Sequence, residues 1–168
     1  MIVFFYRNLF LLILALLPAG AAGWAQIAHS KRFEIDESKP SLAIRHIFKD
    51  HNGFLWLATN AGLYRFNGVK CQYIAMPGDS LLEVSAIGEG SDNTLWVGFQ
   101  NGAIASVRNN LANWFRPEEG LPRVAITSFY TDPSNRVWFA TAGEGVYYMA
   151  SRHLYNIDNQ DGLTDNYV

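Results

Sequence analysis

The sequence predicts an all-β protein built from repeated four-stranded units, and three observations indicate this fold class. A tryptophan recurs at intervals of 40 and 42 residues, at Trp56, Trp96 and Trp138, and brings a similar neighbourhood with it each time. Aromatic residues make up 14% of the chain and charged residues only 17%, which suits a large apolar β core. After the first 25 residues, no window shows a sustained helical period. A repeat of about 40–45 residues is typical of β-propeller blades, so we expect about three four-stranded antiparallel blades.

Counting from each tryptophan brings the three units into register. Apolar residues stand nine and twelve positions before it, namely Ile44, Ile47, Val84, Ile87, Ile126 and Phe129. A small residue stands two positions after it, namely Ala58, Gly98 and Ala140. Because side chains alternate along a strand, the tryptophan and the small residue share one face, and we expect the next blade to lie close above that face.

Each unit contains four short runs that are rich in β-branched or aromatic residues and bounded by Gly, Asn, Asp or Pro. Such runs predict strands joined by turns. In chain order, the predicted strands are 43–48, 54–59, 63–66, 71–75, 85–89, 95–99, 103–107, 112–116, 126–131, 137–141, 146–149 and 153–157. A glycine follows each tryptophan by six or seven residues (Gly62, Gly102 and Gly145), where a tight turn requires a positive φ. We interpret the tryptophans as core residues rather than as platforms for a ligand.

The N-terminus has the layout of a secretory signal peptide. A basic residue precedes the apolar run Leu9–Leu17, and Pro18 and several small residues follow it up to Ala25. The apolar run is shorter than the ~20 residues of a spanning helix, which favours cleavage after Ala25 over a retained membrane anchor. Cleavage after Ala21 is the alternative site. The predicted segments are a signal peptide (1–25), a lead-in (26–40), propeller repeats (41–82, 83–123 and 124–165) and the start of a fourth repeat (166–168).

The last residues resemble the linker that leads into an earlier unit. Gly162 and Leu163 stand as far before Val168 as Gly120 and Leu121 stand before the first strand of the third unit. We therefore expect a truncated fourth repeat at the C-terminus. Since propellers usually have 4–8 blades, we also expect the chain to be the front of a longer protein with an incomplete propeller here.

The sequence contains no recognisable catalytic or metal-binding motif. Its histidines fall at no ligand spacing: His29, His46, His51 and His153. The segment 158–162 looks like a calcium loop, but its register puts Ile157 and Val168 where carboxylates are required. The single cysteine, Cys71, gives no disulfide framework, and we expect it to be a buried small hydrophobic residue. A net charge of −2 without a basic patch argues against nucleic acid as a partner. We expect no catalytic residue, no metal and no cofactor, and the ligand-binding residues are unknown.

The segments Ile47–Phe66 (IFKDHNGFLWLATNAGLYRF) and Phe129–Tyr148 resemble the two-component regulator propeller repeat. The middle copy departs from it, because Gly90 replaces the aspartate and Phe99 replaces the threonine. The resemblance covers about residues 41–168. It implies blades of a seven-bladed propeller in the periplasmic region of a membrane sensor. In this family a β-sandwich, a transmembrane helix and a histidine kinase or a diguanylate cyclase typically follow, and this sequence contains none of these modules.

Together, these features predict an extracytoplasmic sensory module that binds a small ligand such as an oligosaccharide. The resemblance further implies inner-membrane attachment through downstream segments and a homodimer as one state of the full-length sensor. One alternative is a scaffold propeller that binds another protein. Another is a secreted propeller enzyme, a lyase or a glycosidase. The recurring Asp50 and Asp132 are more typical of turn formers than of catalytic carboxylates, so we expect no catalysis in this fragment.

Ligand contacts in repeat proteins are expected where the copies differ. Polar residues vary among the units on the first strand and in the turn after the second. These positions are Arg45, Ser85, Thr127, Asn60, Gln100 and Glu144. Each of them also fits a solvated surface residue, so none is assigned to a site.

Overall fold

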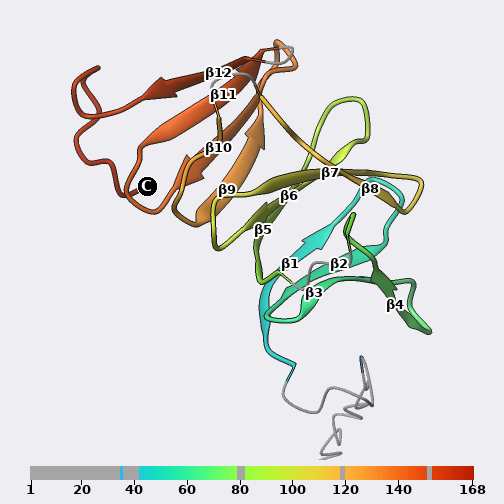
Figure 1. The fold of residues 1–168 in the computed structure, drawn as a ribbon. Coiled ribbons are helices and arrows are strands. Elements are labelled where there is room, and N and C mark those ends of the chain that lie inside the picture. The colour runs from blue at the N-terminus through green and yellow to red at the C-terminus, as the bar shows by residue number, and fades with distance from the viewer. Residues whose placement is uncertain (1–34, 36–41, 79–81, 118–119, 151–152) are drawn as a thin grey trace, which may run out of the picture. The chain divides into compact units, whose positions relative to one another are not determined.

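The structure, a computed structural model, describes residues 35, 42–78, 82–117, 120–150 and 153–168. These residues form twelve β-strands and no helix, as the sequence predicts (Figure 1). The described chain accordingly has no helix with the length and hydropathy of a membrane span. The predicted signal peptide and most of the lead-in segment lie outside the described residues.

The strands form three four-stranded antiparallel sheets, and each sheet is built from strands that are consecutive in the sequence. The first sheet contains β1 (Ile44–Lys49), β2 (Leu55–Thr59), β3 (Gly62–Phe66) and β4 (Cys71–Ile74). The second contains β5 (Val84–Glu89), β6 (Leu95–Phe99), β7 (Ile104–Arg108) and β8 (Leu111–Trp114). The third contains β9 (Ile126–Thr131), β10 (Val137–Thr141), β11 (Val146–Ala150) and β12 (His153–Ile157). We call these sheets blades 1, 2 and 3.

The predicted strands agree with the observed ones to within one or two residues at each end. The turn between the second and third strands also has the expected backbone. Its glycine has a positive φ in every blade, of 111° at Gly62, 82° at Gly102 and 77° at Gly145. A side chain at these positions would strain the backbone, which explains why glycine recurs there.

The first strand of each blade contains a bulge that the sequence does not reveal. In β1, Ile44 and His46 pair with adjacent residues of β2, which leaves Arg45 as an extra residue. Ser85 in β5 and Thr127 in β9 occupy the same place. A bulge bends the strand and redirects the side chain at that point. Three of the variable polar positions are therefore bulge residues.

Two hydrophobic clusters join the three blades. The first combines residues of blade 1, such as Trp56, with Val84 and Val97 of blade 2. The second combines Ala86 of blade 2 with blade 3 residues that include Phe139. Blade 2 therefore packs against a neighbour on both of its faces, as expected for the middle member of a stack.

In blades 1 and 2, the small residue that follows the tryptophan lies beneath the next blade, as predicted. A Cβ atom built on Gly98 would lie 2.5 Å from the Cβ of Ile126 in β9, so only glycine fits there without a shift. Ala58 is fully buried in the cluster that contains Val84. These contacts bring the second strand of one blade against the first strand of the next.

The burial of the tryptophans is less uniform than predicted. Trp56 is only 5% exposed, in agreement with a core role, whereas Trp96 and Trp138 are half-buried. Trp138 borders an apolar groove on the outward face of blade 3, where no further described blade packs. Cys71 is half-buried as well, because it begins the edge strand β4, and this partial burial raises the pKa of its thiol.

Candidate functional site

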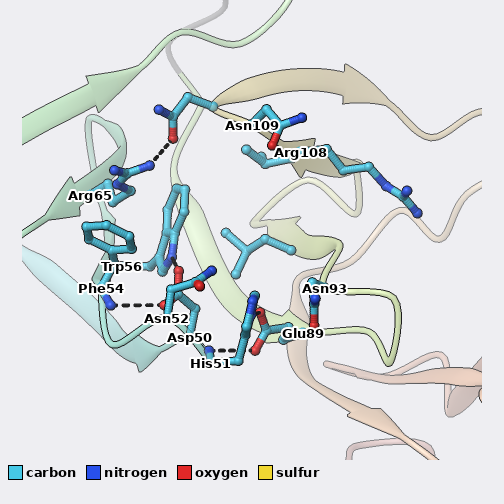
Figure 2. A pocket seen from close by; sticks show the side chains of 13 residues that line it. Asp50, His51, Asn52, Phe54, Trp56, Arg65, Glu89, Asn93, Arg108 and Asn109 are labelled. Atoms are coloured by element: carbon cyan, nitrogen blue, oxygen red, sulfur yellow. Dashed lines mark hydrogen bonds and ion pairs between the residues drawn. The ribbon is translucent and has the colours of Figure 1, made fainter.

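A cavity with polar lining and a volume of about 260 Å³ lies between blades 1 and 2 (Figure 2). Its walls come from the β1–β2, β5–β6 and β7–β8 turns and from the adjoining strands. The lining residues are Asp50, His51, Asn52, Phe54, Trp56, Arg65, Glu89, Asn93, Leu95, Val107, Arg108, Asn109 and Asn110. In an antiparallel sheet of consecutive strands, the first and third turns lie at the same end, so turns of two blades converge on this space.

Asp50 forms the base of the pocket by fixing the β1–β2 turn. Its carboxylate accepts hydrogen bonds from the backbone N–H of Phe54 (2.9 Å) and from Nε1 of Trp56 (2.8 Å). Asp132 has the same role in blade 3, where it accepts Nε1 of Trp138 at 2.9 Å. The pKa of Asp132 is lowered to about 2, chiefly by that indole hydrogen bond. The geometry therefore supports a structural role for the recurring aspartate.

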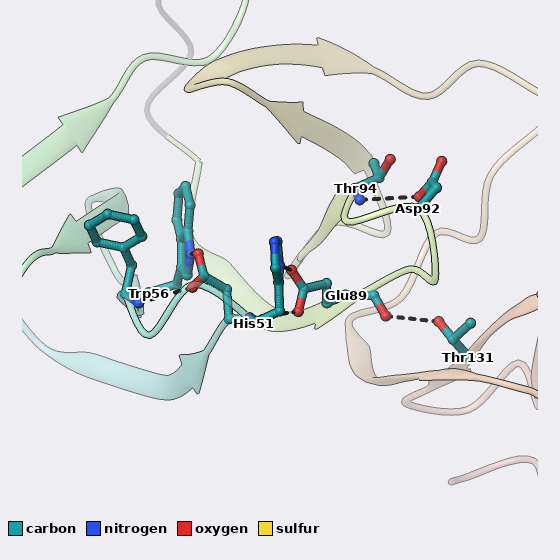
Figure 3. Close-up of polar contacts among 8 residues, drawn as sticks. His51, Trp56, Glu89, Asp92, Thr94 and Thr131 are labelled. Carbon is teal, nitrogen blue, oxygen red and sulfur yellow. Dashed lines mark hydrogen bonds and ion pairs between the residues drawn. The ribbon is translucent and has the colours of Figure 1, made fainter.

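His51 and Glu89 connect blade 1 to blade 2 at the edge of the pocket. Nδ1 of His51 lies 2.5 Å from one oxygen of the Glu89 carboxylate, and the backbone N–H of His51 donates to the other oxygen at 3.1 Å. The backbone carbonyl of Glu89 accepts a hydrogen bond from Oγ1 of Thr131 at 2.9 Å, which extends the contacts to blade 3 (Figure 3). In Figure 2 the imidazole ring points into the pocket. The contact with Glu89 fixes the orientation of the ring and leaves Nε2 for a ligand.

Arg65 lies on the opposite side of the pocket and projects from β3. Its guanidinium carbon lies 3.9 Å from the centroid of the Phe54 ring and 5.9 Å from that of Trp56. Nη1 of Arg65 donates to Oδ1 of Asn110 in the β7–β8 turn. Within the described part of the chain, no carboxylate forms an ion pair with Arg65. By contrast, Arg108 at the rim pairs with Asp92.

The two asparagines of the β7–β8 turn lie at the top of the pocket. Asn109 and Asn110 have positive φ angles of 51° and 64°, which is the signature of a two-residue type I′ turn. Asparagine tolerates this conformation better than most residues. The turn is short, and the side chain of Asn110 reaches Arg65 of blade 1 from it.

The variable positions chosen from the sequence do not line this pocket. Asn60, Gln100 and Glu144 lie in the β2–β3, β6–β7 and β10–β11 turns, which are at the other end of the sheets. Two of them bind the segment that leads into the first strand of their blade. Oδ1 of Asn60 accepts a hydrogen bond from the backbone N–H of Ala43, and Oε1 of Glu144 accepts one from the backbone N–H of Arg123. The bulge residues also make structural contacts, as in the ion pair of Arg45 with Glu83 (2.8 Å) and the hydrogen bond from Thr127 to Val168 (2.7 Å).

Sequence reasoning missed the residues that do form the pocket. His51 aligns with Ser91 and Pro133 in the other repeats, five positions before the tryptophan. Arg65 pairs across the sheet with Trp56, and the residues opposite the other tryptophans are Ser106 and Tyr148. His51 and Arg65 do not repeat either, but they lie in the first turn and on the third strand, whereas the positions chosen from the sequence lie on the first strand and in the second turn. In the described chain, no cluster of His, Cys, Asp and Glu could hold a metal ion.

Comparison with known proteins agrees with the fold. Residues 38–61 and 120–143 match the two-component regulator propeller family. The two segments cover the first two strands of blades 1 and 3, whereas the divergent blade 2 is not matched. No curated protein matches the chain.

Several solved structures share the blade arrangement. One is the extracellular domain of a hybrid two-component system from B. thetaiotaomicron (24% identity, TM-score 0.64), which covers 82% of this chain and 20% of that one. Another is the extracellular domain of a one-component system from the same organism (20% identity, TM-score 0.63, 75% of this chain and 18% of that one). A third is virginiamycin B lyase from Staphylococcus aureus (21% identity, TM-score 0.58, 73% and 44%). The chain spans about a fifth of the length of the two extracellular domains, and the likeness establishes the propeller fold.

Proposed function

This chain carries two-component regulator propeller repeats, and we propose that it belongs to the extracytoplasmic ligand-binding region of a sensor protein. Two of the similar structures are extracellular domains of one- and two-component systems, which supports this placement. The ligand that we propose is a small polar compound, of which a short saccharide is the leading example.

The observation that carries this proposal is the pocket between blades 1 and 2. Residues that recur in every repeat build the blade, so residues that occur once are available for specific binding. The pocket brings together such residues from two blades, namely His51, Arg65 and Asn109. Its volume of about 260 Å³ lies just below the ~300–1,000 Å³ of sites for drug-sized ligands. It therefore suits one sugar ring or the end of a chain.

Ligand-dependent thermal stabilisation of the full chain tests this function. A ligand that binds the native state stabilises it by about 2.7 kcal/mol at a concentration of 100 Kd, so the Tm should rise with concentration. We expect a saturable rise with at least one compound in a panel of mono- and oligosaccharides. His51→Gln should reduce it, whereas Gln100→Ala, at the other end of blade 2, should not. A panel without any saturable shift, or an equal loss in both variants, would contradict the proposal.

A second candidate is catalysis, favoured by the contact between His51 and Glu89. A carboxylate that orients an imidazole, with the second ring nitrogen facing a pocket, is a common arrangement for a general base. Incubation of the full chain with the saccharide panel, followed by chromatography, tests this alternative. Product that forms with the native chain and not with His51→Gln would establish an enzyme, and unchanged saccharides would exclude catalysis on that panel.

A further inference from the structure

We infer that the pocket between blades 1 and 2 recognises the negatively charged group of an acidic sugar, a carboxylate such as that of a uronic acid. This assignment rests on the proposed function and specifies its ligand. It follows from which hydrogen-bonding groups in the pocket are already used and which remain.

Both acidic side chains that line the pocket form hydrogen bonds with other groups of the protein. Asp50 accepts from the backbone of Phe54 and from the indole of Trp56. Glu89 accepts from the backbone and the ring of His51. Each of their oxygens therefore already accepts one hydrogen bond from the protein, which leaves these carboxylates only partly available to the hydroxyl groups of a neutral sugar.

The aromatic faces of the pocket are also occupied. Trp56 is almost completely buried, and the guanidinium of Arg65 lies over the ring of Phe54. Trp56 therefore offers no open face for a neutral pyranose, and Arg65 covers one face of Phe54. The cation–π contact instead holds Arg65 in place, so less side-chain freedom is lost when it binds a ligand.

The donors that remain favour an oxyanion. Arg65 has five N–H groups in a planar fork, and the recorded hydrogen bond to Asn110 uses one nitrogen. A guanidinium binds a carboxylate through two parallel hydrogen bonds, which are stronger than hydrogen bonds between neutral groups. The Asn109 amide at the rim can add a further donor.

The equivalent position between blades 2 and 3 provides an internal comparison. A cavity of about 390 Å³ lies there, lined in part by Ser91, Asp92 and Asn135. No arginine, lysine or histidine lines it, because Ser91 stands in the place of His51 and Ser106 in the place of Arg65. The basic side chains thus belong to one interface and do not follow from the blade fold.

Calorimetric titration of the full chain with glucuronate, glucose and inorganic sulfate tests this inference. We expect glucuronate to bind at least about tenfold more tightly than glucose, which has the same ring without the charge. Sulfate separates recognition of the acidic sugar from binding of any oxyanion, since sulfate that binds as tightly as glucuronate would overturn the sugar assignment. Arg65→Gln should weaken glucuronate binding about tenfold or more, and Arg65→Lys should retain part of it. Arg116→Gln, a charge change outside the pocket, serves as the control and should leave binding unchanged.

Because Arg65 packs on Phe54, its substitution also removes a packing contact. The test therefore needs a second variant at a position outside the core. Asn109→Asp adds a negative charge in an exposed turn whose backbone aspartate tolerates, and it should also weaken glucuronate binding. Equal binding of glucose and glucuronate with no effect of Arg65→Gln and Asn109→Asp would overturn this inference and leave the proposed function standing. Absence of binding by any neutral or acidic saccharide would overturn both.

Discussion

In blades 1 and 3, an aspartate six residues before the tryptophan connects the first turn of the blade to its second strand through hydrogen bonds. In blade 3, Asp132 accepts hydrogen bonds from the backbone of Ser134 and Arg136 and from the indole of Trp138, and it forms an ion pair with the Arg136 side chain (2.7 Å). All of these contacts favour the ionised carboxylate. Blade 2 has Gly90 at this position and places its carboxylate two residues later. The hydrogen bond from the tryptophan indole to this aspartate is therefore a feature of blades 1 and 3.

Asp132 should make the stability of the protein depend on pH in the acid range. Its pKa falls from 3.8 to about 2 in the folded chain. A depressed pKa means that folding favours the ionised form, so the stabilisation is complete above pH ~4 and is lost as the pH falls toward 2. Asp132→Asn should flatten the dependence of the urea midpoint on pH between 4 and 2. Asp165→Asn, an exposed change near the C-terminus, should leave the slope as it is, and an unchanged slope in Asp132→Asn would contradict the role of this carboxylate.

A buried threonine hydroxyl closes the turn between the second and third strands in blades 1 and 3. Thr59 is fully buried, donates to the carbonyl of Gly62 at 2.7 Å and accepts from the backbone of Ala61 at 3.1 Å. Thr59→Val keeps the shape of the side chain but removes both of these hydrogen bonds. The substitution should cost about 1–3 kcal/mol in urea unfolding. The exposed Thr127→Val provides the control with the same chemistry and should cost less. Equal losses would show that the buried hydroxyl is not what stabilises the turn.

At the scale of the strand, neighbouring blades fit through complementary sizes. The small residue of one second strand faces the apolar residue of the next first strand. Blade 2 pairs the smallest residue, Gly98, with the larger Ile126, whereas the first cluster contains Ala58 together with the smaller Val84. The summed side-chain volume of the two residues is thus similar at the two interfaces, as close packing requires.

Gly98→Ala should be destabilising, and a second substitution should restore part of the stability. The added methyl would lie 2.5 Å from the Cβ of Ile126, and overpacking of this kind costs about 1–3 kcal/mol. Ile126→Val alone should cost about 0.5–1.5 kcal/mol. The double variant recreates the Ala–Val combination of the first interface, so its loss should be smaller than the sum of the two single losses. Strict additivity in a double-mutant cycle would contradict a direct contact between these residues.

The strands could be predicted because each repeats a local signal, whereas the pocket joins residues that are distant in the sequence. His51 and Glu89 are 38 residues apart, and Arg65 and Asn110 are 45 residues apart. From its sequence neighbours alone, His51 is predicted to be a turn residue and Arg65 a polar residue of a strand. The position of Arg65 is defined only when the register of β2 and β3 places it opposite Trp56. The bulges were missed for another reason, because the extra residue recurs at the same place in every repeat and so leaves the alignment of the repeats unchanged.

In the described part of the chain, the stability of each blade depends on the blades that it contacts. The three sheets are connected in series, and blade 2 contributes to both hydrophobic clusters, whereas blades 1 and 3 contribute to one each. In such an array each unit is stabilised by its own packing and by the interfaces that it shares. A loss of packing inside blade 2 should therefore weaken the whole array, while an equal change on an outward face should have a local effect.

A matched pair of valines tests this dependence. Val97 is fully buried in the cluster between blades 1 and 2, whereas Val146 is half-buried and borders the open groove on the outward face of blade 3. Val97→Ala should cost about 2–3 kcal/mol, because it removes buried methyl groups and leaves a cavity. Val146→Ala removes the same atoms from a partly exposed site and should cost less than about 1 kcal/mol. Urea unfolding with a common slope measures both losses. If the two variants lost equal stability, blade 2 would not be the unit that holds the array together, and the blades would unfold independently of one another.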